Sequence, residues 1–262
     1  NGVDVMFNPQ LKIPASALEH IEIIYTVDTA KVPAFAEIVA AITKWTNFNV
    51  CNEHGKLRCI ACNKAGAVPF TVDFSKLDAS WIIVIDSLTQ VSNSVMNMIK
   101  IARGVDPTLV TDDDSKSNFN DFGKQGTWLD NNLAAIQNCP YNIIVISHEQ
   151  EVKQDDGTEK LVPVGGTRNF SRNVSRYFGH VVKMSLVNRK HKGISSSTAS
   201  STMLTGSRTG ANTETFGGEE GESILRTIFT DYTNYVRTET PYVAPVLAAG
   251  TKPAAGATTN VK

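Results

Sequence analysis

No apolar run in the sequence approaches about 20 residues and no charged-then-apolar leader opens it, so we expect neither a membrane span nor a signal peptide. An excess of one charge is also missing, because 25 Lys and Arg residues face 26 Asp and Glu residues and leave a net charge of −1. Nucleic acid would therefore have to be bound through a local basic patch. We expect a cytoplasmic protein that does not bind membranes.

The sequence does contain enough apolar material for a full core. Its 262 residues are 41% hydrophobic and 19% charged, which suits one large α/β domain or a domain with appendages. The apolar pattern predicts strands at 20–27, 67–74, 81–85 and 143–146, helices at 30–45, 94–104 and 127–139, and a polar loop at 106–126.

Residues 81–89, "WIIVIDSLT", place a run of five apolar residues directly before Asp86 and Ser87. Such a run is typical of a strand covered on both faces in a parallel sheet, where ligands bind beyond the carboxyl ends of the strands. Asp86 could hold Mg²⁺ through water beside a nucleotide phosphate. The alternative is that this pattern only caps the helix that follows.

A second buried strand, residues 143–146, ends in a similar way, in a polar cluster that begins with Ser147 and His148. Two such strands predict an α/β fold with a mostly parallel central sheet and a polar rim at its carboxyl edge.

Three of the four cysteines lie close to a histidine, in the array C-x2-H-x4-C-x2-C formed by Cys51, His54, Cys59 and Cys62. Two chelating pairs with two-residue spacers let four ligands converge tetrahedrally, which predicts a structural zinc knuckle with no open position for catalysis. The alternative is a set of reduced thiols and a surface histidine. Cys139 lies far away and is expected to be a packing thiol.

Basic residues gather after a glycine-containing polar loop at 151–167 that we expect to be mobile. Arg168, Arg172 and Arg176 recur at i, i+4 and i+8, so a helix there would have one basic face, and Lys183 extends the charge. This face could follow the phosphates of a single nucleic-acid strand, or it could be a solvated surface.

The order of these segments resembles the RecA-like ATPase core, and in particular the phage RecA-like recombination ATPases associated with single-strand annealing. The resemblance covers about residues 18–230 and is carried mainly by "YNIIVISHEQE", "PVGGTRNFSRNVSRYFGHVV" and "LTGSR". It implies an ATPase core over 1–236, with the zinc knuckle as an insertion at 48–72. The tail at 237–262 lies outside the resemblance, and we expect it to be flexible because it is rich in Ala, Pro and Thr.

The resemblance also implies roles for individual residues. Asp86, followed by Ser87, would position the Mg²⁺ of bound ATP, and Ser147 and His148 would take the place of the polar sensor beside the γ-phosphate. Arg208 would reach the nucleotide of a neighbouring subunit in a ring or filament. The loop after the sensor would meet single-stranded DNA, and the tail would bind other replication or recombination proteins.

One departure from the family pattern is that no segment reads G-x-x-x-x-G-K-[ST], the loop whose amides cradle the phosphates. The family pattern places this loop before residues 21–35, so we expect it upstream of Asn1 and expect no ATP hydrolysis by the chain as it stands. Two alternatives remain open: a nucleotide-free scaffold that binds DNA or protein, and a different P-loop motor such as a helicase or packaging motor.

Overall fold

The computed structural model describes residues 21, 24, 26–51, 56–67, 69–108, 116–153, 156–188, 190–195 and 205–207. Its helices are α3 (Ala34–Lys44), α4 (Ile60–Ala65), α5 (Leu88–Ala102), α6 (Phe119–Ile136) and α7 (Arg168–Asn173), with 3₁₀ turns η2 (Phe74–Lys76) and η4 (Val174–Tyr177). Its strands are β1 (Asn47–Val50), β2 (Phe70–Asp73), β3 (Ile82–Asp86), β4 (Asn142–Ile146), β5 (Glu149–Lys153), β6 (Glu159–Pro163), β7 (His180–Val181), β8 (Lys183–Val187), β9 (Lys190–Ile194) and β10 (Gly206–Ser207).

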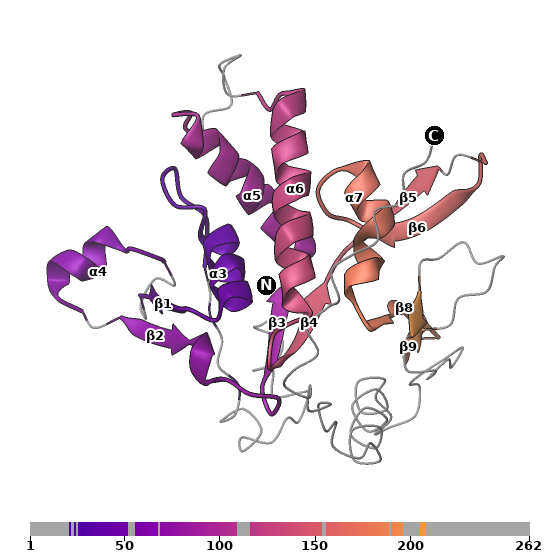
Figure 1. Ribbon diagram of the computed structural model, residues 1–262, viewed down its shortest axis with the longest axis horizontal. Coiled ribbons are helices and arrows are strands. Elements are labelled where there is room, and N and C mark those ends of the chain that lie inside the picture. Colours follow the sequence, from indigo (N-terminus) through magenta and orange to yellow (C-terminus); the bar gives the residue numbers. More distant parts are fainter. Residues whose placement is uncertain are drawn as a thin grey trace, which may run out of the picture.

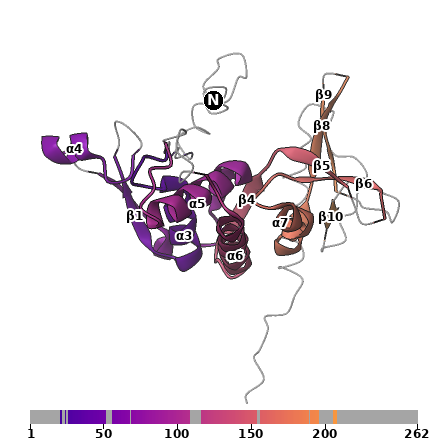
Figure 2. The same cartoon turned by 90° about the horizontal axis from the view of Figure 1, so that it is seen from above.

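Helices α3, α5 and α6 form the middle of the molecule, and the smaller sheets lie on either side of them (Figure 1). The unit β1–α4–β2 lies at one end, and the hairpins β5–β6 and β8–β9 lie at the other, as the view from above also shows (Figure 2). Among the described residues, no helix combines the length and the apolar character needed to cross a membrane.

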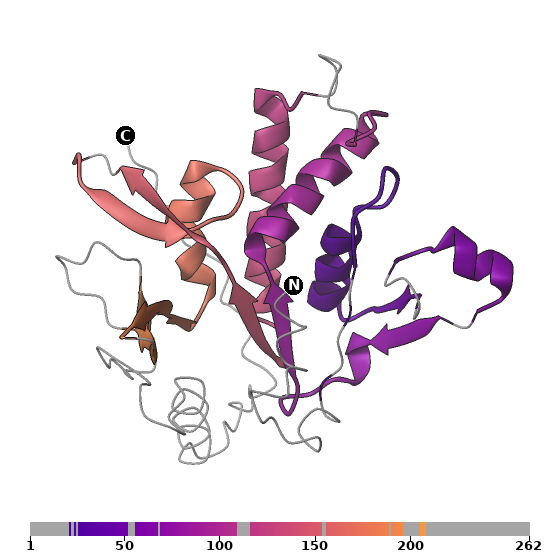
Figure 3. The same cartoon turned by 180° about the vertical axis from the view of Figure 1, so that it is seen from behind.

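The central strands β3 and β4 are parallel, with Asp86 opposite Ile146 at their carboxyl ends. Figure 3 shows these two strands side by side from the other face. The strands predicted at 81–85 and 143–146 are therefore confirmed. The prediction of a mostly parallel sheet holds for this pair alone, because the other four sheets of the described residues are antiparallel hairpins or short pairs.

The prediction that the first of these strands is covered on both faces is wrong for the described structure. Only Ile85 is buried in β3, whereas the side chains of Ile82 and Val84 are 47% and 55% exposed. Side chains alternate between the two faces of a strand, so the helices cover one face and leave the other accessible.

The hydrophobic core lies between the three central helices and the covered face of β3 and β4. Leu88, Val91, Val95 and Ile99 recur every three or four residues along α5 and are all buried, as expected for the inward face of an amphipathic helix. Leu129 of α6 packs into the same cluster and is completely buried.

Helix α6 begins earlier than the sequence pattern predicts, so the expected loop at 106–126 is wrong in its last part. The helix begins with a capping box, in which Asp121 N donates to Asn118 Oδ1 and Asn118 N donates to Asp121 Oδ2, each at 3.0 Å. Asp121 is 1% exposed and also forms an ion pair with Arg103 at the end of α5. Gly123 and Gly126 lower the helical propensity of this turn, and the cap and the ion pair offset that loss.

The polar segment expected to be a mobile loop at 151–167 contains an ordered hairpin instead. Strands β5 and β6 pair antiparallel from Glu149 opposite Pro163 to Lys153 opposite Glu159. Each strand buries one valine, Val152 or Val162, which is too weak a pattern to predict a strand from sequence.

Candidate functional site

The carboxyl edge of β3 and β4 gathers the side chains predicted to meet a nucleotide. Because the strands are parallel and in register at Asp86 and Ile146, Ser147 and His148 leave the sheet at the same edge as Asp86. Asp86 and His148 are exposed, and Ser147 is half-buried. The parallel register therefore brings these three predicted site residues to one rim.

The helix cap at this edge is made by Ser87, and Asp86 takes no part in it. Ser87 is the N-cap of α5, and its Oγ accepts a hydrogen bond from Gln90 N at 3.4 Å. Within the described part of the chain, no group donates a hydrogen bond or forms an ion pair to the Asp86 carboxylate. An exposed carboxylate without a hydrogen-bond donor suits a hydrated Mg²⁺, so Asp86 fits that ion, whereas the buried Ser87 side chain is used structurally.

Ser147 is held by the chain that returns from the β5–β6 hairpin. Its Oγ lies 3.1 Å from the carbonyl oxygen of Val164 and 2.9 Å from that of His148, so its proton is directed at main-chain acceptors. Val164 N in turn donates to His148 O at 2.8 Å. The predicted sensor residues are therefore tied to the segment that follows the hairpin.

The predicted basic helix face is interrupted, because α7 ends at Asn173 and Arg176 lies on the 3₁₀ turn η4. Arg172 donates to the carbonyl oxygen of Lys153, and Lys183 forms an ion pair with Glu149 at 3.1 Å. Arg176 pairs with Asp130 at 3.1 Å and lies over the ring of Tyr177. These three cations have partners within the chain, while Arg168 is exposed at the start of α7.

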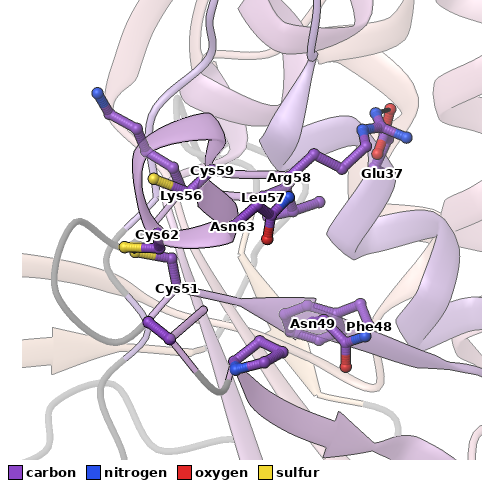
Figure 4. A pocket seen from close by; sticks show the side chains of 12 residues that line it. Glu37, Phe48, Asn49, Cys51, Lys56, Leu57, Arg58, Cys59, Cys62 and Asn63 are labelled. Atoms are coloured by element: carbon purple, nitrogen blue, oxygen red, sulfur yellow. Dashed lines mark hydrogen bonds and ion pairs between the residues drawn. The ribbon is translucent and has the colours of Figure 1, made fainter. Parts of the chain in front are cut away.

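Three of the four predicted zinc ligands lie together in the unit β1–α4–β2, which we call the cysteine module (residues 47–73, described except for 52–55 and 68). The sulfur atoms of Cys51, Cys59 and Cys62 all lie within 4.8 Å of one another and all three residues are buried. None of the three forms a disulfide, and Cys51 Sγ is 2.9 Å from Cys62 Sγ. Figure 4 shows the side chains of Cys51 and Cys62 with their sulfur atoms next to each other. His54 lies outside the described residues.

Local structure explains how thiols from two segments meet. Cys51 follows β1, Cys59 is the N-cap residue of α4, and Cys62 lies one turn into that helix. Gly66 ends α4 in a left-handed conformation with φ of 70°, which returns the chain to β2. The hydrogen bond with Cys51, followed by burial, raises the pKa of the Cys62 thiol to about 12.

The chemistry of this donor set fits a soft, tetrahedral cation such as Zn²⁺, because three sulfur ligands converge and one position is left for a fourth. A cavity of about 460 Å³ opens beside the thiols and is also lined by Lys56, Asn63 and Arg58. Arg58 forms an ion pair with Glu37 of α3, which ties the module to the central helices (Figure 4).

Two sets of structural contacts near the site were not evident in the sequence. Asp28 accepts hydrogen bonds from Ser94 Oγ at 2.8 Å, from Asn97 Nδ2 at 2.9 Å and from Phe35 N at 3.2 Å, so it joins α5 to the start of α3. Its partners lie up to 69 residues away, which no local pattern reveals. The second set consists of the hydrogen bonds made by residues 164–166. The sequence gives no indication of them apart from the adjacent glycines Gly165 and Gly166.

Arg208, the tail at 237–262 and four of the eight residues of the strand predicted at 20–27 lie outside the described residues. The described residues 21, 24, 26 and 27 are not part of a strand. The helix predicted at 30–45 is confirmed as α3, and the strand predicted at 67–74 is confirmed as β2, which pairs with β1.

Comparison with known proteins gives one match. A family model described as an AAA domain matches residues 19–211, whereas no curated protein and no solved structure matches the chain. The match confirms the predicted P-loop NTPase class, with its α/β fold and nucleotide-binding type of function, but not the narrower resemblance to phage recombination ATPases. Because the match spans well over half of the 262 residues, this chain belongs to the AAA domain family.

Proposed function

We propose that this protein is an ATP-dependent, single-stranded-DNA-binding protein of the RecA-like type, which acts in recombination or annealing in the cytoplasm of a phage-infected cell. The observation that carries the proposal is the shared edge of β3 and β4, where Asp86 stands in register with the residue before Ser147 and His148. An acidic and a polar strand end side by side are the arrangement that a nucleotide and its metal require in α/β sheets.

Asp86 is the proposed Mg²⁺ residue, because its carboxylate is exposed and the neighbouring Ser87 performs the capping. Mg²⁺ held there would offset the negative charge of the phosphates. Ser147 and His148 are proposed to sense the γ-phosphate, and Arg208 to reach the nucleotide from a neighbouring subunit of a ring or filament.

DNA is proposed to lie across α7 and the β5–β6 hairpin. Arg168, the first residue of α7, is exposed, and its side chain makes no hydrogen bond or ion pair with another described residue. Arg172, Arg176 and Lys183 could contact phosphates only by sharing or exchanging their present partners. We therefore assign the first phosphate contact to Arg168 and a supporting role to the other three.

Zn²⁺ is the proposed structural cofactor of the cysteine module, with His54 as the fourth ligand beside the three thiols. The buried sulfur cluster supports this assignment. All four positions would then be filled by protein, so the ion would stabilise the module and take no part in the reaction.

The test uses the protein expressed from its natural gene and compares it with Asp86→Asn and with Asp78→Asn. Asp78 lies just before the other end of β3 and accepts a hydrogen bond from Ser80, so it is a matched acidic control. We expect DNA-stimulated ATP hydrolysis to fall by about two orders of magnitude or more in Asp86→Asn and to be unchanged in Asp78→Asn.

The other outcomes are distinct. Full turnover by Asp86→Asn would remove Asp86 from its role. Single-stranded DNA affinity that is indifferent to ATP in the natural protein would favour a nucleotide-free scaffold. Processive duplex unwinding would favour a helicase-type motor.

A further inference from the structure

The connector 164–166 (Val164, Gly165 and Gly166) joins β6 to α7 and is bound to several separate elements of the fold. The carbonyl oxygen of Val164 accepts hydrogen bonds from Thr89 Oγ1 on α5 at 3.2 Å and from Ser147 Oγ at 3.1 Å. One main-chain oxygen therefore links the returning hairpin both to the first turn of α5 and to the end of β4.

Gly165 is bound in turn by Ser171 of α7, which is completely buried. Ser171 Oγ accepts from Gly165 N at 3.2 Å and donates to Gly165 O at 2.8 Å. Ser171 Oγ also accepts a hydrogen bond from Gln150 Nε2 on β5 at 3.1 Å. The connector is thus also tied to the outgoing strand of the hairpin.

Gly166 is bound by a buried pair, Ser92 of α5 and Gln125 of α6. Gly166 N donates to Ser92 Oγ at 2.6 Å, and Gln125 Nε2 donates to the same Oγ at 3.0 Å and to Ser92 O at 2.8 Å. Gln125 is 4% exposed, and its Oε1 has no hydrogen-bond partner among the described residues. A buried acceptor without a donor is unusual in proteins and calls for an explanation.

The packing at the connector leaves no room for a side chain at Gly165 or Gly166. A Cβ atom on Gly165 would lie 2.8 Å from Leu88 Cγ, and one on Gly166 would lie 2.7 Å from Leu129 Cδ1. Gly166 also has a φ of +57°, which favours glycine. The main chain of the connector therefore lies directly against α5 and α6, and it cannot move without moving these contacts.

We propose that Ser92 and Gln125 are positioning residues that couple the Asp86 edge to the β5–β6 hairpin, an inference that rests on the proposed function. Leu88 and Thr89, which contact the connector, follow Asp86 by two and three residues. A shift of the first turn of α5 at an occupied Asp86 edge is therefore passed to the connector and to both strands of the hairpin.

The test compares Ser92→Ala with Ser94→Ala in the protein from its natural gene. The two serines lie two residues apart on α5, and both are buried with an Oγ that accepts a main-chain N–H, but Ser94 binds Ala36 N on the opposite side of the helix. Two quantities are measured with and without Mg²⁺ and ATP: the affinity for a single-stranded oligonucleotide, and amide hydrogen exchange in β5 and β6.

We expect nucleotide to raise DNA affinity about tenfold and to change hairpin exchange in the natural protein and in Ser94→Ala. In Ser92→Ala we expect both responses to fall to less than about twofold, although the two variants lose similar thermal stability. Gln125→Met, which fills the same space without the amide, should behave like Ser92→Ala, and it decides the matter if Ser92→Ala does not fold.

A nucleotide response in Ser92→Ala and Gln125→Met equal to that of the natural protein would overturn the coupling while leaving the proposed function intact. A natural protein whose DNA affinity ignores nucleotide would overturn both.

Discussion

The central helices and the cysteine module are stabilised in different ways. Helices α3, α5 and α6 share a continuous apolar cluster in which Ala36, Val95 and Leu129 are completely buried. The module has two four-residue strands and a small apolar cluster completed by Ala34 of α3, and its other buried group is the set of three thiols. Two-stranded hairpins are marginal in water, so the module needs a further source of stability where the core does not.

A bound ion is the source that the thiol cluster suggests, and its removal should give the largest effect. We expect the purified protein to hold one Zn²⁺ and Cys62→Ser to lose it, because structural zinc sites contribute about 10–16 kcal/mol of apparent binding energy. The measurements are metal content by mass spectrometry and hydrogen exchange across residues 47–73. Exchange should rise in the module and stay low in α5 and α6.

Cys139→Ser is the matched control for this substitution, since Cys139 Sγ contacts the carbonyl oxygens of Ile42 and Ala135 and lies outside the cluster. It should keep the metal. Cobalt substitution identifies the ligands: tetrahedral d–d bands with three thiolate charge-transfer contributions support the assigned set, and His54→Ala should alter them. If the metal-free module were fully protected from hydrogen exchange, the proposed difference in stabilisation between the module and the central helices would be wrong.

Loss of apolar volume in the core should lower the stability of the whole fold. The response of the module to the loss of metal should instead stay local. Leu129→Ala should lower the free energy of unfolding by about 2–5 kcal/mol, because a completely buried leucine leaves a cavity. Phe119→Ala on the same helix should change it by less than about 0.5 kcal/mol, since Phe119 is 94% exposed. Chemical denaturation of both variants checks the contrast. Equal losses would mean that Phe119 is covered in solution, for example by a second copy.

Features that depend on a few neighbouring residues could be predicted from the sequence. The strands at 81–85 and 143–146, the edge with Asp86 and the thiol array are local patterns of a few residues, and all appear where predicted. Helix α7 is shorter than its i, i+4, i+8 arginines suggest, because spacing alone does not show that Asn173 ends the helix. The ion pair of Arg176 with Asp130, which is 46 residues earlier, also comes from tertiary packing.

Contacts between distant segments were beyond prediction. Ser92 and Gly166 are 74 residues apart, and Asp28 and Ser94 are 66 residues apart. Each pair joins a common polar residue to a main-chain or hydroxyl group, and such residues occur throughout the sequence. Only the fold identifies which of them meet, so the coupling network and the Asp28 contacts required the structure.

The hairpin β5–β6 is also two-stranded, but unlike the cysteine module it has no thiol cluster. It closes with a turn at Asp156 and Gly157. Asp156 Oδ1 accepts hydrogen bonds from Thr158 Oγ1 at 2.6 Å and from Thr158 N at 2.9 Å. The Thr158 hydroxyl, followed by its main-chain N–H, holds the pKa of the Asp156 carboxyl below its usual range.

The smallest predicted effect follows from this pKa. Because the folded pKa lies below the unfolded value of about 3.9, the turn is fully stabilised above that pH and loses this stabilisation as the pH falls through the folded pKa. The protection factors of the β5 and β6 amides, which are corrected for the intrinsic effect of pH on exchange, should therefore fall in acid in the natural protein. In Asp156→Asn they should already be lower at neutral pH and show no such fall. An acid response that survives the substitution would assign it to another carboxylate of the hairpin. A response limited to Asp156 would show that this hairpin depends on a side-chain turn, in contrast to the proposed dependence of the cysteine module on Zn²⁺.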